Sequence, residues 1–336
     1  MERYNQGRRE FLKLVGIGGG VLSGLVHLPL AFAKDVYPAE RITWVVATKA
    51  GGAFDLIARV SGPYLTRYLK ESSKGAKGGE IMIKNVPEAG GKRAYNNIFH
   101  ANSDGYTIGD FNTAFITDTI TDKIEFDCNK FTFLLRTAAS LRLILTHKKG
   151  FKNWNEMMKA GKEKELKWAA SNFGRGHHVA CILVKEAAKV PARLINFPGA
   201  AENANALVRG DVDIAIMAEE SAKPMIDAGE FRALTVLSKT SPYPGVPSIA
   251  ELGYPELADT LKVHRMIVAP PDLPTEVTNI LLSGFKKLFA NKEFLAQAKK
   301  MDFTPDPLYG ADAERMAKSL FKYIDEKTPI LKKYLM

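Results

Sequence analysis

Runs of apolar and β-branched residues alternate along the chain with segments in which apolar residues recur every three or four positions. The runs have the length and composition of strands buried on both faces, and the second pattern is typical of amphipathic helices. This alternation predicts an α/β fold with largely parallel sheets covered by helices on both faces. The predicted helices include Phe54 to Leu69, Trp154 to Ala160, Val179 to Lys189 and Ala201 to Val208. The predicted strands are Ile42 to Thr48, Ile81 to Val86, Tyr106 to Phe111, Leu141 to His147, Leu166 to Ser171, Arg193 to Phe197, Asp213 to Met217, Ala233 to Leu237 and Val263 to Ala269.

The first 33 residues carry the parts of an export signal. Residues 8 to 13, Arg-Arg-Glu-Phe-Leu-Lys, precede a modestly apolar stretch from Leu14 to Leu28, and small residues follow at Ala31-Phe32-Ala33. The paired arginines are similar to those of bacterial twin-arginine signals, although Gly7 stands where Ser or Thr is usual. A retained membrane anchor is the alternative, but the apolar stretch is shorter than the roughly 20 residues of a span. We therefore expect cleavage after Ala33 and a mature chain in the periplasm.

Length and composition narrow the class of protein and its partners. With 336 residues, of which 46% are hydrophobic, the chain fits two domains. The net charge is +10, but Lys and Arg are scattered singly and are not interleaved with aromatic residues as in a nucleic-acid binder. We expect no nucleic-acid partner and a general attraction for anionic solutes. Cys128 and Cys181 are too few for a disulfide framework and too far apart for a metal knuckle.

Polar turns follow several predicted strands, at the positions where α/β sheets bind ligands. The first is residues 48 to 55, Thr-Lys-Ala-Gly-Gly-Ala-Phe-Asp, in which two glycines permit close backbone approach and the next helix directs unpaired N–H groups at a ligand. It lacks the known phosphate-loop patterns, so it is either another kind of anion site or a plain tight turn. The second turn is residues 85 to 97. At the third, Asn112 and Thr113 either donate to a ligand or cap a helix.

The fourth turn, at residues 171 to 184, has the most unusual charge pattern. The positive end of a helix dipole favours acidic residues, yet Ser171 to His178 contains none and instead offers Arg175, His177 and His178. This arrangement is favourable if an anion binds there; the alternative is that the three side chains form a solvated surface. Consecutive residues on a helix point about 100° apart, so the two histidines cannot both face one metal ion, and we expect no metal site.

Short motifs over nearly the whole mature chain occur in a characteristic order. They are "GGAFDLIAR", "NVPEAGG", "DGYTIG", the turn at residues 171 to 178, "INFPGAAENANALVRGDVDIAI", "MIDAGEFRALTVLS", "PGVPSIAELGYPEL" and "VAPPDLP". In this order they resemble the extracytoplasmic solute receptors of tripartite tricarboxylate transporters, the Bug or TctC family. The resemblance implies the type II periplasmic binding fold: two α/β lobes, each with a mostly parallel sheet flanked by helices, and a ligand cleft between them. It implies one lobe at residues 34–138 plus 264–336 and the other at residues 139–263.

The resemblance also implies where a ligand carboxylate is bound. In the family, the loop that matches the first glycine turn lines the cleft, and a second carboxylate position lies in the other lobe. The chain departs from the family pattern at Lys49, Glu88, Pro198 and His264-Arg265, and these departures concern the identity of the ligand. The implied ligand-binding residues and rim positions are Gly51, Gly52, Ala53, Phe54, Asp55, Ser171, Asn172, Gly176, His177, Pro198, Gly199, Ala218 and Glu219. The turns themselves add Asn112, Thr113 and Arg175 to the candidate ligand-binding residues.

The predicted function is that of a periplasmic receptor. It captures an organic di-, tri- or aromatic carboxylate and delivers it to the membrane permease subunits of a tripartite tricarboxylate transporter. We expect a monomer with no catalytic residue, cofactor or metal. One alternative is an exported enzyme that acts on an anionic substrate with His177 or His178 as general base, although no nucleophile, zinc or paired-carboxylate motif accompanies them. Another is a receptor that presents its ligand to a sensor kinase.

Overall fold

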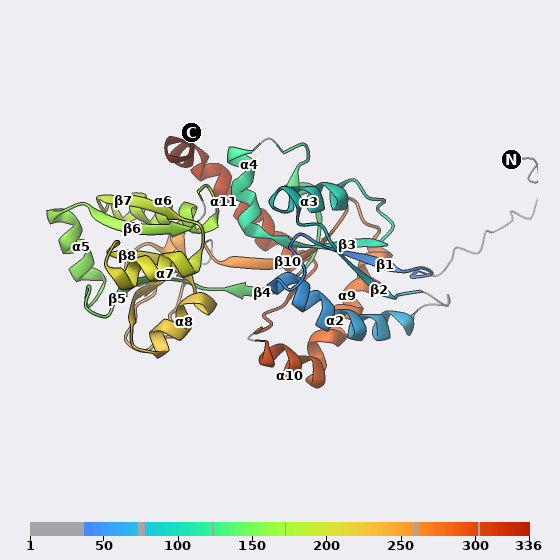
Figure 1. The fold of residues 1–336 in the computed structure, drawn as a ribbon. Coiled ribbons are helices and arrows are strands. Elements are labelled where there is room, and N and C mark those ends of the chain that lie inside the picture. Colours follow the sequence, from blue (N-terminus) through green and yellow to red (C-terminus); the bar gives the residue numbers. More distant parts are fainter. Residues whose placement is uncertain (1–36, 73–77, 123, 172, 259–260, 302) are drawn as a thin grey trace, which may run out of the picture. The chain divides into compact units, whose positions relative to one another are not determined.

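The computed structural model describes residues 37–72, 78–122, 124–171, 173–258, 261–301 and 303–336 (Figure 1). The predicted export signal, with its cleavage after Ala33, and the predicted ligand residue Asn172 lie outside the described residues. Within these ranges, no helix combines the length and the apolar character that a membrane crossing requires.

The first of two sheets contains the strands on either side of the first glycine turn. Its strands are β1 (Ile42–Val46), β2 (Ile81–Asn85), β3 (Thr107–Asn112), β4 (Thr132–Ser140), β10 (Val263–Ala269) and β11 (Leu308–Tyr309). They are ordered β11-β4-β10-β3-β1-β2. β1 is parallel to β2 and β3, whereas β10 is antiparallel to β3 and β4, and β11 is antiparallel to β4.

The second sheet lies between β4 and β10 in the sequence. Its strands are β5 (Arg142–His147), β6 (Leu166–Ser171), β7 (Ala192–Phe197), β8 (Ile214–Ala218) and β9 (Phe231–Val236). They are ordered β7-β6-β8-β5-β9. β6 is parallel to β7 and β8, and β5 is antiparallel to β8 and β9.

Both sheets are therefore mixed, and the prediction of largely parallel pairing holds only for β1–β3 and β6–β8. The difference arises where the chain passes between the sheets: β4 ends at Ser140, and β5 begins at Arg142 in the other sheet. β4 and β5, which are joined without a helical crossover, have only antiparallel neighbours in their sheets. All nine predicted strands are present, with ends within two residues of the predicted bounds. β4 was missed because Arg136 interrupts its apolar pattern; in the structure that guanidinium pairs with Asp306 at 2.6 Å.

Helices cover both faces of the first sheet. On one face lie α2 (Ala53–Lys70), α9 (Thr275–Ala290) and α10 (Lys292–Lys300), in a core where the Trp44 and Phe285 rings are 6.0 Å apart. On the other face lie α3 (Lys92–Phe99) and the C-terminal helix α11 (Ala311–Leu335). The short segments η2 (Thr113–Thr117) and α4 (Asp118–Thr121) follow β3 (Figure 1).

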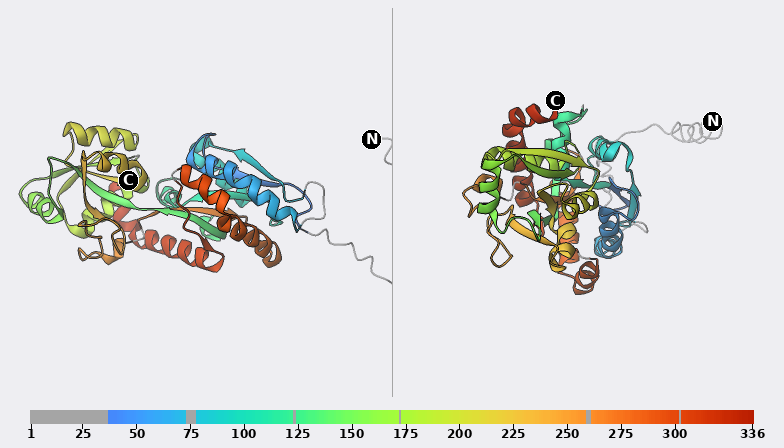
Figure 2. Two further views of the ribbon diagram at one scale, coloured as in Figure 1. Left: turned by 90° about the horizontal axis from the view of Figure 1, so that it is seen from below. Right: turned by 60° about the vertical axis from the view of Figure 1, so that its left-hand side comes forward.

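The helices of the second sheet are arranged in the same way. α5 (Trp154–Glu163) and α6 (Gly176–Ala188) cover one face, and α7 (Ala200–Arg209) and α8 (Glu219–Asp227) cover the other (Figure 2). The first pair packs around Trp168, and the second packs on Leu143 and Ala169. The core under α6 continues beneath α11 to the first sheet. Cys128 and Cys181 are both buried in this core as free thiols.

Candidate functional site

The first glycine turn joins β1 to α2. Gly51 has a φ of +82°, a left-handed conformation that glycine adopts without steric cost. Gly52 is the N-cap of α2 and provides no side-chain acceptor, and a Cβ atom there would lie 3.1 Å from the Lys49 carbonyl oxygen. The first N–H groups of α2, including those of Ala53 and Phe54, therefore lack an intrahelical acceptor and are available to an anion.

Asp55 holds this turn in place. Its carboxylate is 1% exposed and accepts hydrogen bonds from the Gly51 N–H at 2.8 Å, from Arg59 Nε at 2.9 Å and from Asn85 Nδ2 at 2.8 Å. Burial raises the pKa of Asp55, but these hydrogen bonds outweigh burial and hold the pKa below its usual range. The carboxylate therefore stays ionised, and its partners come from the turn, from α2 and from the end of β2.

Asn112 and Thr113 have structural partners at the end of β3. The Asn112 side chain accepts a hydrogen bond from the Ala114 N–H at 2.9 Å, so it caps η2. The Thr113 hydroxyl accepts from the His264 N–H at 3.1 Å and donates to the His264 carbonyl oxygen at 3.4 Å. The sequence left open whether these residues donate to a ligand or cap a helix. In the structure Asn112 caps η2, and Thr113 connects η2 to β10 through hydrogen bonds.

The start of α6 matches the charge pattern seen in the sequence. Arg175 is the N-cap, its side chain makes no capping hydrogen bond, and the first turn contains no acidic residue. Just before it, the Gly174 N–H donates to His178 Nδ1 at 2.9 Å. Ser171, 2% exposed at the end of β6, accepts from Asn203 Nδ2 at 2.7 Å. Its own hydroxyl proton therefore remains available for donation.

The two histidines of this turn do not supply positive charge. Burial, together with the nearby Arg142 guanidinium, lowers the pKa of His177 to about 3. Burial also lowers the pKa of His178. Both imidazoles are neutral at physiological pH, so the predicted group of three cations is reduced to Arg175. Among the described residues, no three side chains of His, Cys, Asp or Glu are close enough together to hold a metal ion.

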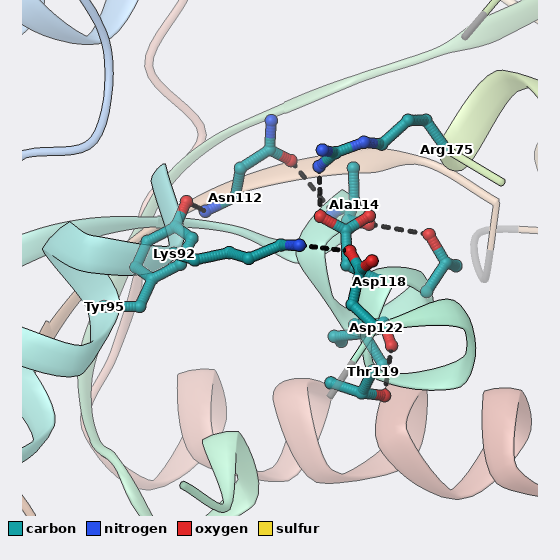
Figure 3. Close-up of polar contacts among 10 residues, drawn as sticks. Lys92, Tyr95, Asn112, Ala114, Asp118, Thr119, Asp122 and Arg175 are labelled. Carbon is teal, nitrogen blue, oxygen red and sulfur yellow. Dashed lines mark hydrogen bonds and ion pairs between the residues drawn. The ribbon is translucent and has the colours of Figure 1, made fainter. Parts of the chain in front are cut away.

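Arg175 forms an ion pair with Asp118 of α4, as Figure 3 shows. The Asp118 side chain is 2% exposed, and a Cβ atom on Gly90 would lie only 2.9 Å from Arg175 Nη2, so the guanidinium also contacts the second glycine turn. Burial, although opposed by Arg175, raises the pKa of Asp118 to about 6. Lys92 pairs in turn with Asp122 at 2.6 Å (Figure 3). The predicted ligand cation thus has a protein partner.

Two other arginines lie at the ends of strands beside the predicted site residues. Arg265 of β10 is opposite Asn112, donates to Ser140 Oγ at 2.6 Å and to Glu220 Oε1 at 2.8 Å, and lies 6.0 Å from the centre of the Phe54 ring. Arg142 of β5 is opposite Ala218 and is 4% exposed. Sequence reasoning noted Arg265 but missed Arg142; a single charge at the start of an apolar strand was the available signal.

The starts of α7 and α8 already contain acidic side chains. Gly199 is the N-cap of α7, and Glu202 lies in its first turn. α8 begins at Glu219, which accepts a hydrogen bond from the Tyr243 hydroxyl at 2.5 Å. An anionic ligand would meet like charge at both helices, so Pro198, Gly199, Ala218 and Glu219 are less suited to hold a carboxylate than the starts of α2 and α6.

Contacts connect the predicted residues from both sheets. Arg265 links Phe54 at the start of α2 to the end of β3. A Cβ atom on Gly176 would lie 3.2 Å from Cβ of Ala114 in η2 and 2.6 Å from Nη2 of Arg142. The structure therefore brings the start of α6 against the segment that follows β3. Arg265, opposite Asn112 at the end of β3, contacts Phe54 of α2.

The chain matches known proteins over most of its length. The family model described as "Tripartite tricarboxylate transporter family receptor" matches residues 65–334. The UPF0065 protein in the tcbD-tcbE intergenic region of Pseudomonas sp. strain P51 is 27% identical over 335 residues, 95% of either chain.

Solved structures share the fold at lower sequence identity. A TctC solute binding protein from Polaromonas has a TM-score of 0.73 at 18% identity, over 86% of this chain and 99% of that one. MatC from Rhodopseudomonas palustris, solved with bound malate, has a TM-score of 0.63 at 21% identity, over 88% of this chain and all of that one. Because the family match extends from residue 65 to residue 334, the chain belongs to the tripartite tricarboxylate transporter receptors, TctC, which are two-lobed solute-binding receptors and not enzymes.

Proposed function

We propose that the mature chain is a periplasmic receptor that captures an organic di-, tri- or aromatic carboxylate and delivers it to the membrane permease of a tripartite tricarboxylate transporter. An export signal at residues 1–33, cleavage after Ala33 and a monomeric state are parts of this proposal. The observation that carries it is the acid-free start of α6, which lies against the segment after β3. The malate in the related R. palustris protein supports the same class of ligand.

The carboxylates would be held by backbone N–H groups and a hydroxyl. In the first lobe the donors are the N–H groups of Ala53 and Phe54, which Asp55 leaves free by bonding to Gly51 instead. In the second lobe they are the first N–H groups of α6 and the Ser171 hydroxyl, whose oxygen already accepts from Asn203. Hydrogen bonds to an ionised group are shorter and stronger than neutral ones, especially where water is excluded.

The lobe bounds are those expected from the sequence, residues 34–138 plus 264–336 and residues 139–263. Sheet membership supports them, since β4 and β10 belong to the first sheet and β5 to β9 to the second. A ligand that contacts both lobes stabilises their closed arrangement by its differential affinity for that state.

A bound carboxylate should raise the melting temperature of the mature protein. A ligand at 100 times its Kd adds about 2.7 kcal/mol to the free energy of unfolding. We expect this in thermal melts with at least one of malate, succinate, adipate, citrate and terephthalate, together with a smaller radius of gyration in X-ray scattering. The corresponding neutral amides serve as controls and should give no shift.

Failure of every acid at millimolar concentration, with folded protein, would contradict carboxylate capture. Delivery is tested separately by uptake of the identified acid into cells with and without the receptor. If the acid binds but its uptake is unchanged, the permease part of the proposal is wrong, and presentation to a sensor kinase becomes the better explanation.

Replacement of Arg175 with Ala should reduce stability more than it reduces ligand affinity. The variant leaves the buried Asp118 carboxylate without its ion-pair partner, and a buried unpaired charge is strongly destabilising. The loss of stability relative to the wild type should be largest at pH 8. It should diminish as the pH falls below about 6, because Asp118 then becomes protonated. Thermal melts between pH 5 and 8 and calorimetric titration of the ligand measure the two effects.

Arg175→Lys is the matched control because it keeps a positive charge beside Asp118. It should retain more of the stability than Arg175→Ala at pH 8. A large loss of affinity in both variants, with a steep dependence on salt and little change in melting temperature, would instead make Arg175 a direct partner of the ligand.

A further inference from the structure

Arg142 is a buried cation at the junction of the two sheets. Its Nη1 donates to the Leu261 carbonyl oxygen, whereas its buried Nε has no hydrogen-bond partner in the described part of the chain. Among the described residues, no carboxylate forms an ion pair with it. Burial lowers the pKa of Arg142 to about 10, so the group still carries its charge at neutral pH. The Glu220 carboxylate attracts Arg142 from beyond ion-pair distance and only partly offsets burial. A buried charge without a directly paired counter-charge is costly, and its environment therefore favours an anion.

A second source of positive potential lies beside this guanidinium. A Cβ atom on Gly176 would lie 2.6 Å from Arg142 Nη2, so the arginine contacts the first residue of α6. That helix start has no acidic residue in its first turn. Neighbouring His177 is neutral and its buried Nε2 has no hydrogen-bond partner among the described residues. Arg142 and the helix dipole repel each other unless an anion lies between them.

A small cavity adjoins both groups. It has a volume of about 30 Å³, more than one water molecule needs and far less than a pocket for an organic ligand. Arg142 and Gly176 form part of its wall, together with Thr113 and Thr117 of η2 and with Leu320 and Ile324 of α11. A single small ion fits this space, and a dicarboxylate does not.

We propose that this cavity binds one small monovalent anion of the halide class, held by the Arg142 guanidinium beside the start of α6. The site uses none of the donors assigned to the organic ligand, and it does not depend on the proposed function. Its wall comes from η2, β5, α6, α11 and the pair Leu261-Lys262, segments that are associated with both sheets. The bound anion therefore stabilises the junction between the sheets.

The test compares chloride with gluconate, an anion too large for the cavity. Melting temperatures of the mature protein are measured at constant ionic strength while sodium chloride replaces sodium gluconate. We expect a saturable rise with chloride, as mass action requires for a bound ion. Arg142→Met should lose the whole of this chloride-dependent shift. Arg136→Met is the matched control, since Arg136 is largely buried but already has Asp306 as its partner, and it should keep the shift.

Bromide provides a direct measurement that needs no variant. Crystals of the wild-type protein soaked in bromide should show an anomalous peak in contact with Arg142 and the start of α6. The proposal is overturned if chloride gives no saturable shift, if Arg142→Met shifts as the wild type does, or if no bromide peak is found there. It is also overturned if the organic ligand displaces the bromide, because the cavity would then hold a ligand carboxylate. Ligand titrations in gluconate buffer test the receptor function independently.

Discussion

Replacement of Ala53 with Glu is expected to weaken carboxylate binding by at least about 100-fold without lowering the melting temperature. Ala53 is exposed and is the first residue of α2, so a Glu side chain there can reach the free N–H groups of the first turn. Acidic residues at this position stabilise a helix by about 0.3–1 kcal/mol, which protects the fold. The same carboxylate competes with the ligand and repels it, and placing like charges together costs several kcal/mol, where about 2.7 kcal/mol corresponds to 100-fold.

Two controls separate charge at this site from other effects of the substitution. Ala53→Gln has nearly the same size without the charge and should keep most of the affinity. Thr275→Glu introduces the same charge at the exposed first position of α9. Val277, in the same turn, lies against Gly105, which precedes β3 at the end of that strand far from Asn112. It should bind the ligand as the wild type does. Calorimetric titration decides, and wild-type affinity in a folded Ala53→Glu variant would show that the start of α2 does not hold the carboxylate.

The features that sequence reasoning predicted well are encoded by neighbouring residues. The Gly51-Gly52 turn follows from local backbone freedom, and the acid-free start of α6 is visible in the residues from Ser171 to His178. The positions of the strands could be predicted in the same way, because a run of apolar residues indicates a buried strand whatever its neighbours in the sheet. Strand direction is a property of the connections between strands, and the apolar pattern contains no signal for it.

The features that the sequence did not reveal depend on partners far away in the chain. Arg175 and Asp118 are 57 positions apart, and their ion pair gives Arg175 a partner within the protein. The neutral state of His177 follows from burial and from Arg142, neither of which its own turn shows. Arg142 itself was overlooked because a charge at the start of a strand is usually exposed, whereas here α6 covers it.

A second large effect is expected at Asp110, a carboxyl group in the middle of the first sheet. It is 1% exposed on β3, and its Oδ1 accepts the Ala47 N–H at 3.1 Å. Its Oδ2 has no hydrogen-bond partner among the described residues. Burial, only partly offset by the hydrogen bond from Ala47, raises the pKa of Asp110 to about 7. The proposed ligand site makes no use of this carboxyl group.

The raised pKa makes ionisation of Asp110 destabilising. Below pH 3.8, its ordinary pKa, the carboxyl group is protonated in the folded and the unfolded chain alike and gives no difference. Between this value and about 7 the unfolded chain has released the proton while the folded chain retains it. The free energy of unfolding therefore falls as the pH rises, by up to about 1.4 kcal/mol per pH unit from this group. Above about pH 7 Asp110 is ionised in both states, and its ionisation lowers the free energy of unfolding no further.

Asp110→Asn removes this titration and keeps an oxygen for the Ala47 N–H. We expect the variant to gain stability relative to the wild type as the pH rises from 4 to 7 and to keep that gain at pH 8, by an amount on the order of 4 kcal/mol. Denaturant unfolding at each pH measures the difference between the two proteins, in which the opposite contribution of Asp55 and the similar one of Asp118 cancel because both proteins contain them. A difference that stays constant from pH 4 to pH 8 would show that Asp110 is ionised in the folded chain throughout, and that a partner for its Oδ2 offsets the cost of burial.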